Sequence, residues 1–433
     1  MNLPFFIAAR IAFSKKNSFS SIIIRIAIAA VALSVAVMII ASAMISGFKT
    51  EISKKIFGFW GHIHISSVIT DSPTADATPI PDTLPFLKEL RATGQIQYTV
   101  PETILGVETG GERETQTKGG IRHVQEFALK PGIIRSKTAM EGIVLKGVGT
   151  SYDWDNLAPY LLEGSAPSPQ DTSNAAGILL SRQTSDRLQV GVGDKFIVYF
   201  VKEGAQARRL FQVSGIYKTG LEEYDRKFAL CDIRQVQELL NWDSNQVAGY
   251  EVWLDDIRDL EVFNQYVYDE VIPPDLVSAS IREKFPAIFE WLQLQDMNEV
   301  VILGLMLAVA IINMITALLV LVLEHSTMIG ILKSLGERNF RIRRIFLYYA
   351  GVIMARGLFW GNVFGIGLSW LQHQYKFIRL NEADYYISYA PVRLELWTIL
   401  GINIGALVIV LLFLLIPSLA VSKVSPLRAI QFR

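Results

Sequence analysis

Two histidines stand one residue apart in the stretch GHIHI, where they would share one face of a strand. Imidazoles placed in this way can bind zinc, but zinc sites need three or four protein ligands. No third ligand accompanies His62 and His64 nearby, so we expect polar strand residues and no metal site. The single cysteine, Cys231, excludes an internal disulfide and a multi-cysteine zinc site, and is typical of a small buried hydrophobe.

The common catalytic signatures are missing. The sequence has no G-x-x-x-x-G-K-[ST] loop to cradle a nucleoside triphosphate, and no H-E-x-x-H or G-x-S-x-G motif. Its formal net charge of zero argues against nucleic acid as a partner, because that binding needs a basic field. We therefore expect a protein that is not an enzyme and that binds no cofactor directly.

The stretch EHSTMIGILKSLGERNFRIRRIF, residues 324–346, follows an uncharged run, and its first half carries an apolar stripe whereas its second half is strongly basic. Its first half predicts a short helix that Gly336 would end. The apolar stripe of this helix is Met328, Ile331, Leu332 and Leu335, with Lys333 on another side. The second half is a basic anchor of Arg338, Arg341, Arg343 and Arg344. Such a helix can lie on a membrane or dock in a protein groove, while the arginines hold the next apolar segment at the membrane surface.

Another unusual stretch, ARGLFWGNVFGIG, repeats glycine at four-residue spacing. Gly357, Gly361 and Gly365 would let helix backbones approach closely in lipid. Beside them, Arg356 would cost about 2.5–3.5 kcal/mol near mid-membrane, so it should face protein, water or a lipid headgroup. Its position favours the bundle interior or a subunit interface, with snorkelling to the membrane surface as the alternative. Arg356→Leu is expected to insert normally and to impair function.

These residues need a membrane frame, and the composition supplies one. Hydrophobic residues make up 51% of the chain and the mean hydropathy is +0.33, too apolar for an ordinary soluble protein. Four stretches exceed the roughly 20 residues that cross a bilayer. They are residues 22–46, 300–323, 345–371 and 396–421. The first could be a signal peptide cleaved after 41–43, but its length and the internal Arg25 favour an uncleaved anchor.

Lysine and arginine placement predicts the orientation. Basic residues gather in the 324–344 loop described above, and in two further places. Before span one they are Arg10, Lys15 and Lys16, and in the tail they are Lys423, Arg428 and Arg433. Both termini are therefore expected in the cytoplasm, although Lys49, Lys54 and Lys55 just beyond span one weaken the bias.

The expected fold is an α-helical membrane protein with four transmembrane helices and a large periplasmic α/β (α+β) domain between helices one and two. In order, its segments are an amphipathic segment (1–21), span one (22–46), a stalk helix (47–65), the outer domain (66–280), a second stalk helix (281–299), span two (300–323), a coupling loop (324–344), span three (345–371), an outer loop (372–395), span four (396–421) and a cytoplasmic tail (422–433). The two stalk helices would pair through Phe48, Ile52, Ile56 and Phe59 on one side and Phe285, Ile288, Phe289 and Leu292 on the other.

Within the outer domain, strands and helices alternate. A strand is expected to end near Tyr199 and its hairpin partner to begin near Leu210, with FVKEGAQARR as the connection. A helix is expected after Asp232, whose side chain would cap it.

Five stretches, in this order, resemble the FtsX/MacB-type permeases of ABC transporters, and most closely the lipoprotein-releasing LolC/LolE group. They are MISGFKTEISKKIFGFWGHIHI, FQVSGIYKTGLEEYDRKFALCDIRQVQELL, EHSTMIGILKSLGERNFRIRRIF, YYISYAPVRLEL and VSKVSPLRAIQFR. The likeness covers nearly the whole chain. It identifies the third stretch as the family's cytoplasmic coupling helix, with Ile331, Lys333 and Gly336 forming the I-x-K-x-x-G core.

The resemblance implies a permease subunit in a bacterial inner membrane, surrounded by membrane lipid. A separate cytoplasmic ATPase would bind ATP and Mg²⁺ and receive the coupling helix, with Lys333 and the arginines at the rim. A second permease copy or a sibling permease would complete the dimer, and the cargo would be a lipoprotein released toward the outer membrane. The family also allows a MacB-like exporter of periplasmic peptides or drugs, or an FtsX-like regulator of a cell-wall hydrolase.

Two features depart from the family pattern. LolC-type proteins hook a periplasmic lipoprotein chaperone with a longer hairpin loop, and the short FVKEGAQARR leaves that partner open. Arg356 is the second, because this span is usually small and apolar.

Overall fold

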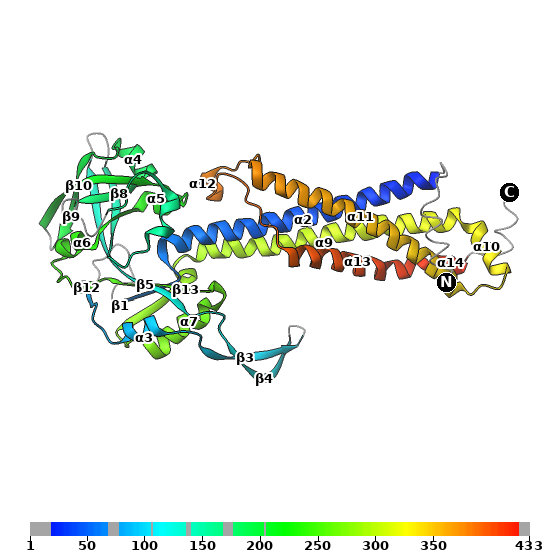
Figure 1. The fold of residues 1–433 in the computed structure, drawn as a ribbon, viewed down its shortest axis with the longest axis horizontal. Coiled ribbons are helices and arrows are strands. Elements are labelled where there is room, and N and C mark those ends of the chain that lie inside the picture. Colours follow the sequence, from blue (N-terminus) through cyan, green and yellow to red (C-terminus); the bar gives the residue numbers. More distant parts are fainter. Residues whose placement is uncertain are drawn as a thin grey trace. The chain divides into compact units, whose positions relative to one another are not determined.

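The computed structural model describes residues 19–67, 78–104, 107–135, 140–167, 176–202 and 205–423 (Figure 1). Most of the expected amphipathic segment (1–21) and of the tail (422–433) lies outside these residues. The chain forms two compact units. A helical unit comprises the first helix up to Glu51, then Glu290–Leu380 and the chain from Ser388 onward, and an outer domain comprises Ile52–Phe289 together with Asn381–Ile387.

Among the described residues, four helices are long and apolar enough to cross a membrane, which confirms the four predicted spans. They are α2 (Phe19–Trp60), α9 (Pro286–Glu324), α11 (Asn339–Tyr375) and α13 (Leu396–Ser418). At about 1.5 Å per residue, the 42 residues of α2 extend about 63 Å, roughly twice the hydrocarbon thickness of a bilayer. Span one and the first stalk are therefore one unbroken helix.

The second stalk begins differently. A short helix, α8 (Ile281–Lys284), carries a capping box in which Ser280 and Glu283 satisfy each other's backbone amides. The chain then restarts as α9 at Pro286, because proline lacks an N–H and is tolerated only in the first turn of a helix.

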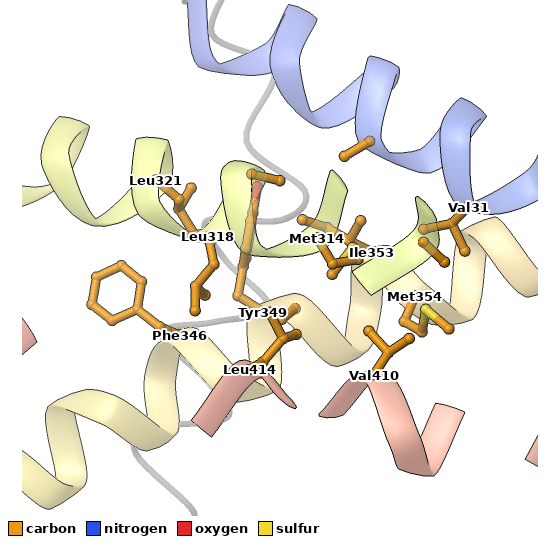
Figure 2. Packing of buried hydrophobic residues seen from close by; sticks show 14 of the residues in the cluster. Val31, Met314, Leu318, Leu321, Phe346, Tyr349, Ile353, Met354, Val410 and Leu414 are labelled. Atoms are coloured by element: carbon orange, nitrogen blue, oxygen red, sulfur yellow. The ribbon is translucent and has the colours of Figure 1, made fainter. Parts of the chain in front are cut away.

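Apolar side chains from all four long helices meet in the core of the helical unit (Figure 2). Val31 of α2, Met314 of α9, Met354 of α11 and Val410 of α13 converge there, each almost fully buried. The outward faces of these helices remain strongly apolar, as expected for surfaces that meet lipid or another membrane protein.

The outer domain is built on a ten-stranded sheet in the order β14-β1-β13-β5-β6-β11-β8-β10-β7, with β9 paired to β10 and β5. The strands are β1 (Ile63–Ser67), β5 (Ile121–Arg135), β6 (Met140–Val148), β7 (Leu161–Gly164), β8 (Gly177–Ser181), β9 (Lys195–Lys202), β10 (Ala205–Tyr217), β11 (Phe228–Asp232), β13 (Gly249–Leu254) and β14 (Leu276–Ser280). Two pairs, β8 with β10 and β6 with β11, are parallel and the others antiparallel.

Helices α3 (Phe86–Ala92), α4 (Arg182–Leu188), α5 (Glu222–Lys227), α6 (Ile233–Leu240) and α7 (Leu260–Tyr266) accompany this sheet, and β2 (Ile80–Pro81) pairs with β12 (Gln246–Val247). The predicted mixed α/β domain between helices one and two is therefore confirmed. The Asp232 carboxylate accepts the backbone N–H of Arg234 at 2.9 Å, which is the expected cap of α6.

Two details differ from expectation. FVKEGAQARR is mostly strand, because β9 and β10 pair from Lys195↔Gln212 up to Lys202↔Ala205. A second hairpin was not predicted: β3 (Gln97–Ile104) pairs with β4 (Val107–Gln116) and stands apart from the large sheet (Figure 1). Its glycines and alternating polar residues carry too little apolar periodicity to mark strands.

Candidate functional site

A short helix, α10 (Ser326–Ser334), lies where the coupling helix was predicted and follows α9 after a single turn residue. It ends where expected, because Gly336 adopts a left-handed φ of 84°. The Gly336 N–H donates to the carbonyl of Lys333 and the Glu337 N–H donates to that of Leu332, both at 3.0 Å. These two hydrogen bonds together form a Schellman motif, which favours glycine at the left-handed position.

The apolar stripe of α10 divides into two faces. Ile329, which the sequence analysis did not include, is fully buried in the core of the helical unit, and Met328 and Leu332 pack against that core. Ile331 and Leu335 instead are 50% and 78% exposed. Because they stand four residues apart, they form one outward apolar ridge. The exposed ridge of α10 is therefore narrower than the sequence indicated.

The amino group of Lys333 is engaged inside this chain. It donates to the carbonyl of Val421 at 2.9 Å and to that of Ser422 at 3.2 Å, both within the short helix α14 (Ala420–Lys423). Desolvation lowers the pKa of Lys333 from its ordinary value. From α11, the Arg343 guanidinium donates to Ser422 Oγ at 2.5 Å. Two cations thus hold the carboxyl end of span four, where helix carbonyls favour positive charge.

The other three arginines of the basic anchor are exposed. Arg338 is the N-cap residue that directly precedes α11. Arg341 lies 3.4 Å from Glu337, and the Arg344 guanidinium lies 4.4 Å from the ring centroid of Phe340, itself an exposed aromatic residue. Within the basic anchor, Arg343 therefore bonds to another part of the chain, whereas the other three arginines remain on the exposed surface.

The glycine row of span three lies directly against α2. A Cβ added to Gly357 would meet Val31 Cγ1 at 2.5 Å, and one added to Gly361 would meet Val35 Cβ at 2.7 Å. At Gly365 the nearest atom would be Ala36 Cα at 3.1 Å. Larger residues would separate the helices, so these glycines set how closely α2 and α11 approach. The neighbouring Arg356 is half-buried.

The predicted stalk residues lie in both units. In the helical unit, Phe48 packs against Trp291 with ring centroids 5.3 Å apart. In the outer domain, Ile52 and Ile56 are fully buried, and Phe289 stacks with Phe57 at 6.2 Å. Phe285 contacts Trp60 at 5.8 Å. The beginning of α9 and the chain just before it therefore pack beside α2 along both stretches.

A buried ion pair, unmarked by any sequence motif, receives the end of α2. Lys146 and Glu251 are both 0% exposed, and their side-chain atoms Nζ and Oε1 lie 2.7 Å apart. Lys146 Nζ also donates to the carbonyl of Phe59 at 2.7 Å, and Gln125 donates to Glu251 at 2.8 Å. Burial lowers the pKa of Lys146 and raises that of Glu251, while their mutual attraction opposes both shifts.

The E-Y-D stretch shapes the surface that holds the loop between spans three and four. The Asp225 carboxylate accepts the backbone N–H groups of Thr219 and Gly220, and burial raises its pKa. Beside this turn, Lys218 forms an ion pair with Glu382. Lys55 of α2 donates to the carbonyl of Tyr386 at 2.8 Å. Residues 381–387 are therefore part of the outer domain, although spans flank them.

The two histidines of GHIHI lie just before β1 and within it. His62 Nδ1 accepts the backbone N–H of Leu254 at 2.8 Å, and His64 is buried within β1. Burial and the charge of Arg122 lower the pKa of His62 to about 4. No group of three metal-ligating side chains occurs among the residues that were described.

Models of two protein families match this chain. The model of the MacB-like periplasmic core domain matches residues 26–267, and that of the FtsX-like permease C-terminal region matches residues 300–426. The chain is 24% identical over 459 residues to the lipoprotein-releasing system transmembrane protein LolE of Haemophilus influenzae, covering 100% of each chain. It is 25% identical over 443 residues to the protein named LolC of Xylella fastidiosa, covering 96% of each.

A solved structure, the extracellular domain of the noncanonic ABC-type transporter YknZ from Gram-positive bacteria, matches 50% of this chain and 98% of its own at 13% identity and a TM-score of 0.31. The first family model alone covers more than half of the chain, and the second covers spans two to four. This protein therefore belongs to the FtsX/MacB family of ABC transporter permeases.

Proposed function

We propose that this permease releases lipoproteins from the bacterial inner membrane toward the outer membrane, driven by a separate cytoplasmic ATPase that binds ATP and Mg²⁺. The proposal places both termini and α10 in the cytoplasm and the outer domain in the periplasm. Its main support for the cargo is the full-length similarity to relatives named as lipoprotein-releasing proteins. The geometry of α10 supports the coupling to an ATPase.

The exposed ridge of α10 fits a docking role. Ile331 and Leu335 present apolar side chains outward, while Ile329 and the bonds of Lys333 hold the opposite side of the helix to the spans. A helix fixed on one face and apolar on the other can dock in a groove of a partner and transmit a push. ATPase closure would move α10, and the 39-residue helix α9 would carry that movement outward.

The cargo chemistry explains the need for ATP. Each buried CH₂ group of an acyl chain contributes about 0.8 kcal/mol to membrane anchoring, so lifting a lipidated protein out of a bilayer costs many kilocalories per mole. We propose that apolar faces of α2 and α9 hold the chains, and that a second permease copy or a sibling permease supplies the facing surface. The two-state element would be the gap between the stalks of the two permeases.

Depletion of the protein in the bacterium that produces it tests the proposal. Lipoproteins should accumulate in the inner membrane while general secretion continues. Normal lipoprotein sorting together with unseparated cells would instead indicate an FtsX-like regulator of a cell-wall hydrolase. Normal sorting with sensitivity to drugs or peptides would indicate a MacB-like exporter. In either of these cases the lipoprotein assignment fails, whereas membership of the permease family does not.

A further inference from the structure

A groove of about 760 Å³ runs along one face of the helical unit, between α2 and α11. The glycine row explains its origin. Gly361 and Gly365 bring the two helices into contact, and each glycine is preceded by a large aromatic residue, Trp360 and Phe364. These aromatic side chains therefore stand beside the contact and form one wall of a slot.

The α2 side of the groove, which is its floor, contains three alanines among larger apolar residues. Ala29, Ala32 and Ala36 recur at helical spacing opposite the wall, where Trp360 and Phe364 stack with ring centroids 5.9 Å apart. Both aromatic residues are about half exposed in this chain, so the slot opens outward. Its lining residues come from α2 and α11, and none of them from α9.

One end of the groove is charged. Arg25, which is exposed, is the one charged side chain among the described residues that line it, and every other lining residue is apolar. From Arg25 to Ile40 the helix rises about 22 Å at 1.5 Å per residue, more than half of the roughly 30 Å hydrocarbon core. The groove thus combines a guanidinium at one end with an apolar slot that is longer than the hydrocarbon depth of one leaflet.

We propose that this groove binds one anionic glycerophospholipid, with its phosphate at Arg25 and an acyl chain along the alanine floor. Guanidinium groups pair with phosphate oxygens through charge-assisted hydrogen bonds. A basic side chain near an anionic headgroup adds about 1 kcal/mol of attraction, which corresponds to about fivefold in affinity. The orientation proposed above assigns this lipid to the cytoplasmic leaflet, and the binding itself does not depend on which cargo the permease releases.

Native mass spectrometry of the full chain extracted from nanodiscs of phosphatidylglycerol and phosphatidylcholine tests the proposal. The wild type should retain one phosphatidylglycerol about fivefold more often than phosphatidylcholine. Arg25→Gln should abolish that preference and Arg25→Lys should keep it. Ala29→Phe should block retention of either lipid, since Ala29 is an exposed floor residue, while Ile26→Phe, exposed but outside the groove, should behave as the wild type.

Three results would overturn this assignment. Equal retention of both lipids that is insensitive to Arg25→Gln would show ordinary annular lipid. Equal retention of a diacylated lipopeptide without a phosphate would make the groove a cargo site. A photo-cross-linker at position 364 that labels a second copy of the chain, and no lipid, would make it a subunit interface. A lipid adduct at position 364 that is lost in Ala29→Phe supports the lipid site.

Discussion

The ammonium of Lys146 lies 2.7 Å from the carbonyl oxygen of Phe59, the next-to-last residue of the first transmembrane helix. Helix ends leave backbone carbonyls without intrahelical partners, and burying them unpaired is costly. Here Lys146 satisfies one such carbonyl, and the indole of Trp253 donates to the nearby carbonyl of Phe57 at 3.1 Å. Glu251 neutralises the lysine. The end of α2 is therefore held by a buried charge in the middle of the sheet.

Removing that lysine should destabilise the protein strongly. Lys146→Met leaves Glu251 buried without its cation and leaves the Phe59 carbonyl unpaired, so the free energy of unfolding should fall by about 3–5 kcal/mol. Chemical denaturation followed by tryptophan fluorescence measures this. The double variant Lys146→Met/Glu251→Leu should recover much of the loss, because no unpaired buried charge remains. Arg187→Met removes an exposed ion pair with Glu141 and should cost less than about 1 kcal/mol. Equal losses in Lys146→Met and Arg187→Met would contradict a buried role.

The outer domain should lose stability as the pH falls through the range below 6.5. His62 has a folded pKa of about 4, whereas an unfolded histidine titrates near 6.5. Between pH 4 and pH 6.5 the imidazole of His62 is protonated in the unfolded chain but neutral in the folded chain. The free energy of unfolding therefore rises with pH in this range, and the contribution of His62 is fully present above pH 6.5. The free energy of unfolding should therefore be about 3 kcal/mol lower at pH 4 than at pH 6.5 through this one group. In His62→Gln the slope of unfolding free energy against pH should be shallower, and an unchanged slope would refute the assignment.

Local sequence signals predicted local structure well. The four spans follow from apolar length, the end of α10 from Gly336, and the start of α6 from the capping carboxylate of Asp232. Each depends on residues within a few positions of the feature. The family membership and the mixed outer domain were also anticipated, because the quoted stretches keep their order along the chain.

Features that depend on distant partners were not predictable in this way. Lys146 and Glu251 meet only because β6 and β13 lie in one sheet, and neither residue stands in a recognisable motif. The apolar stripe of α10 could not be divided into a buried and an exposed face until the packing of the other spans was known. For the same reason the bond from Lys333 to the end of span four was not foreseen, and the rim role expected of Lys333 stays a prediction.

Filling the contact between α2 and α11 should disrupt the helical unit. A leucine at Gly361 would begin with a Cβ only 2.7 Å from Val35 Cβ, so Gly361→Leu should separate the helices and cost about 1–3 kcal/mol, as overpacking does. Gly367 is the matched control, because nothing lies within 4 Å of a Cβ built there. Thermal denaturation in detergent should show a clear loss for Gly361→Leu and little change for Gly367→Leu. Equal behaviour of the two variants would show that the glycine row does not set the helix spacing.

The docking role proposed for α10 depends on the exposed ridge of Ile331 and Leu335. Leu335→Asp places a charge at a 78% exposed apolar position, so the fold and the four spans should be unaffected. A charge in the centre of an apolar docking contact costs about 2 kcal/mol or more, which lowers affinity about thirtyfold. Co-purification with the partner ATPase and stimulation of its hydrolysis should both fall. Ser334→Asp puts the same charge on a neighbouring exposed residue of α10 and should act much more weakly. If both Leu335→Asp and Ser334→Asp retain full ATPase binding and stimulation, the ridge of Ile331 and Leu335 is not the docking surface. The movement of ATPase closure must then enter the permease elsewhere.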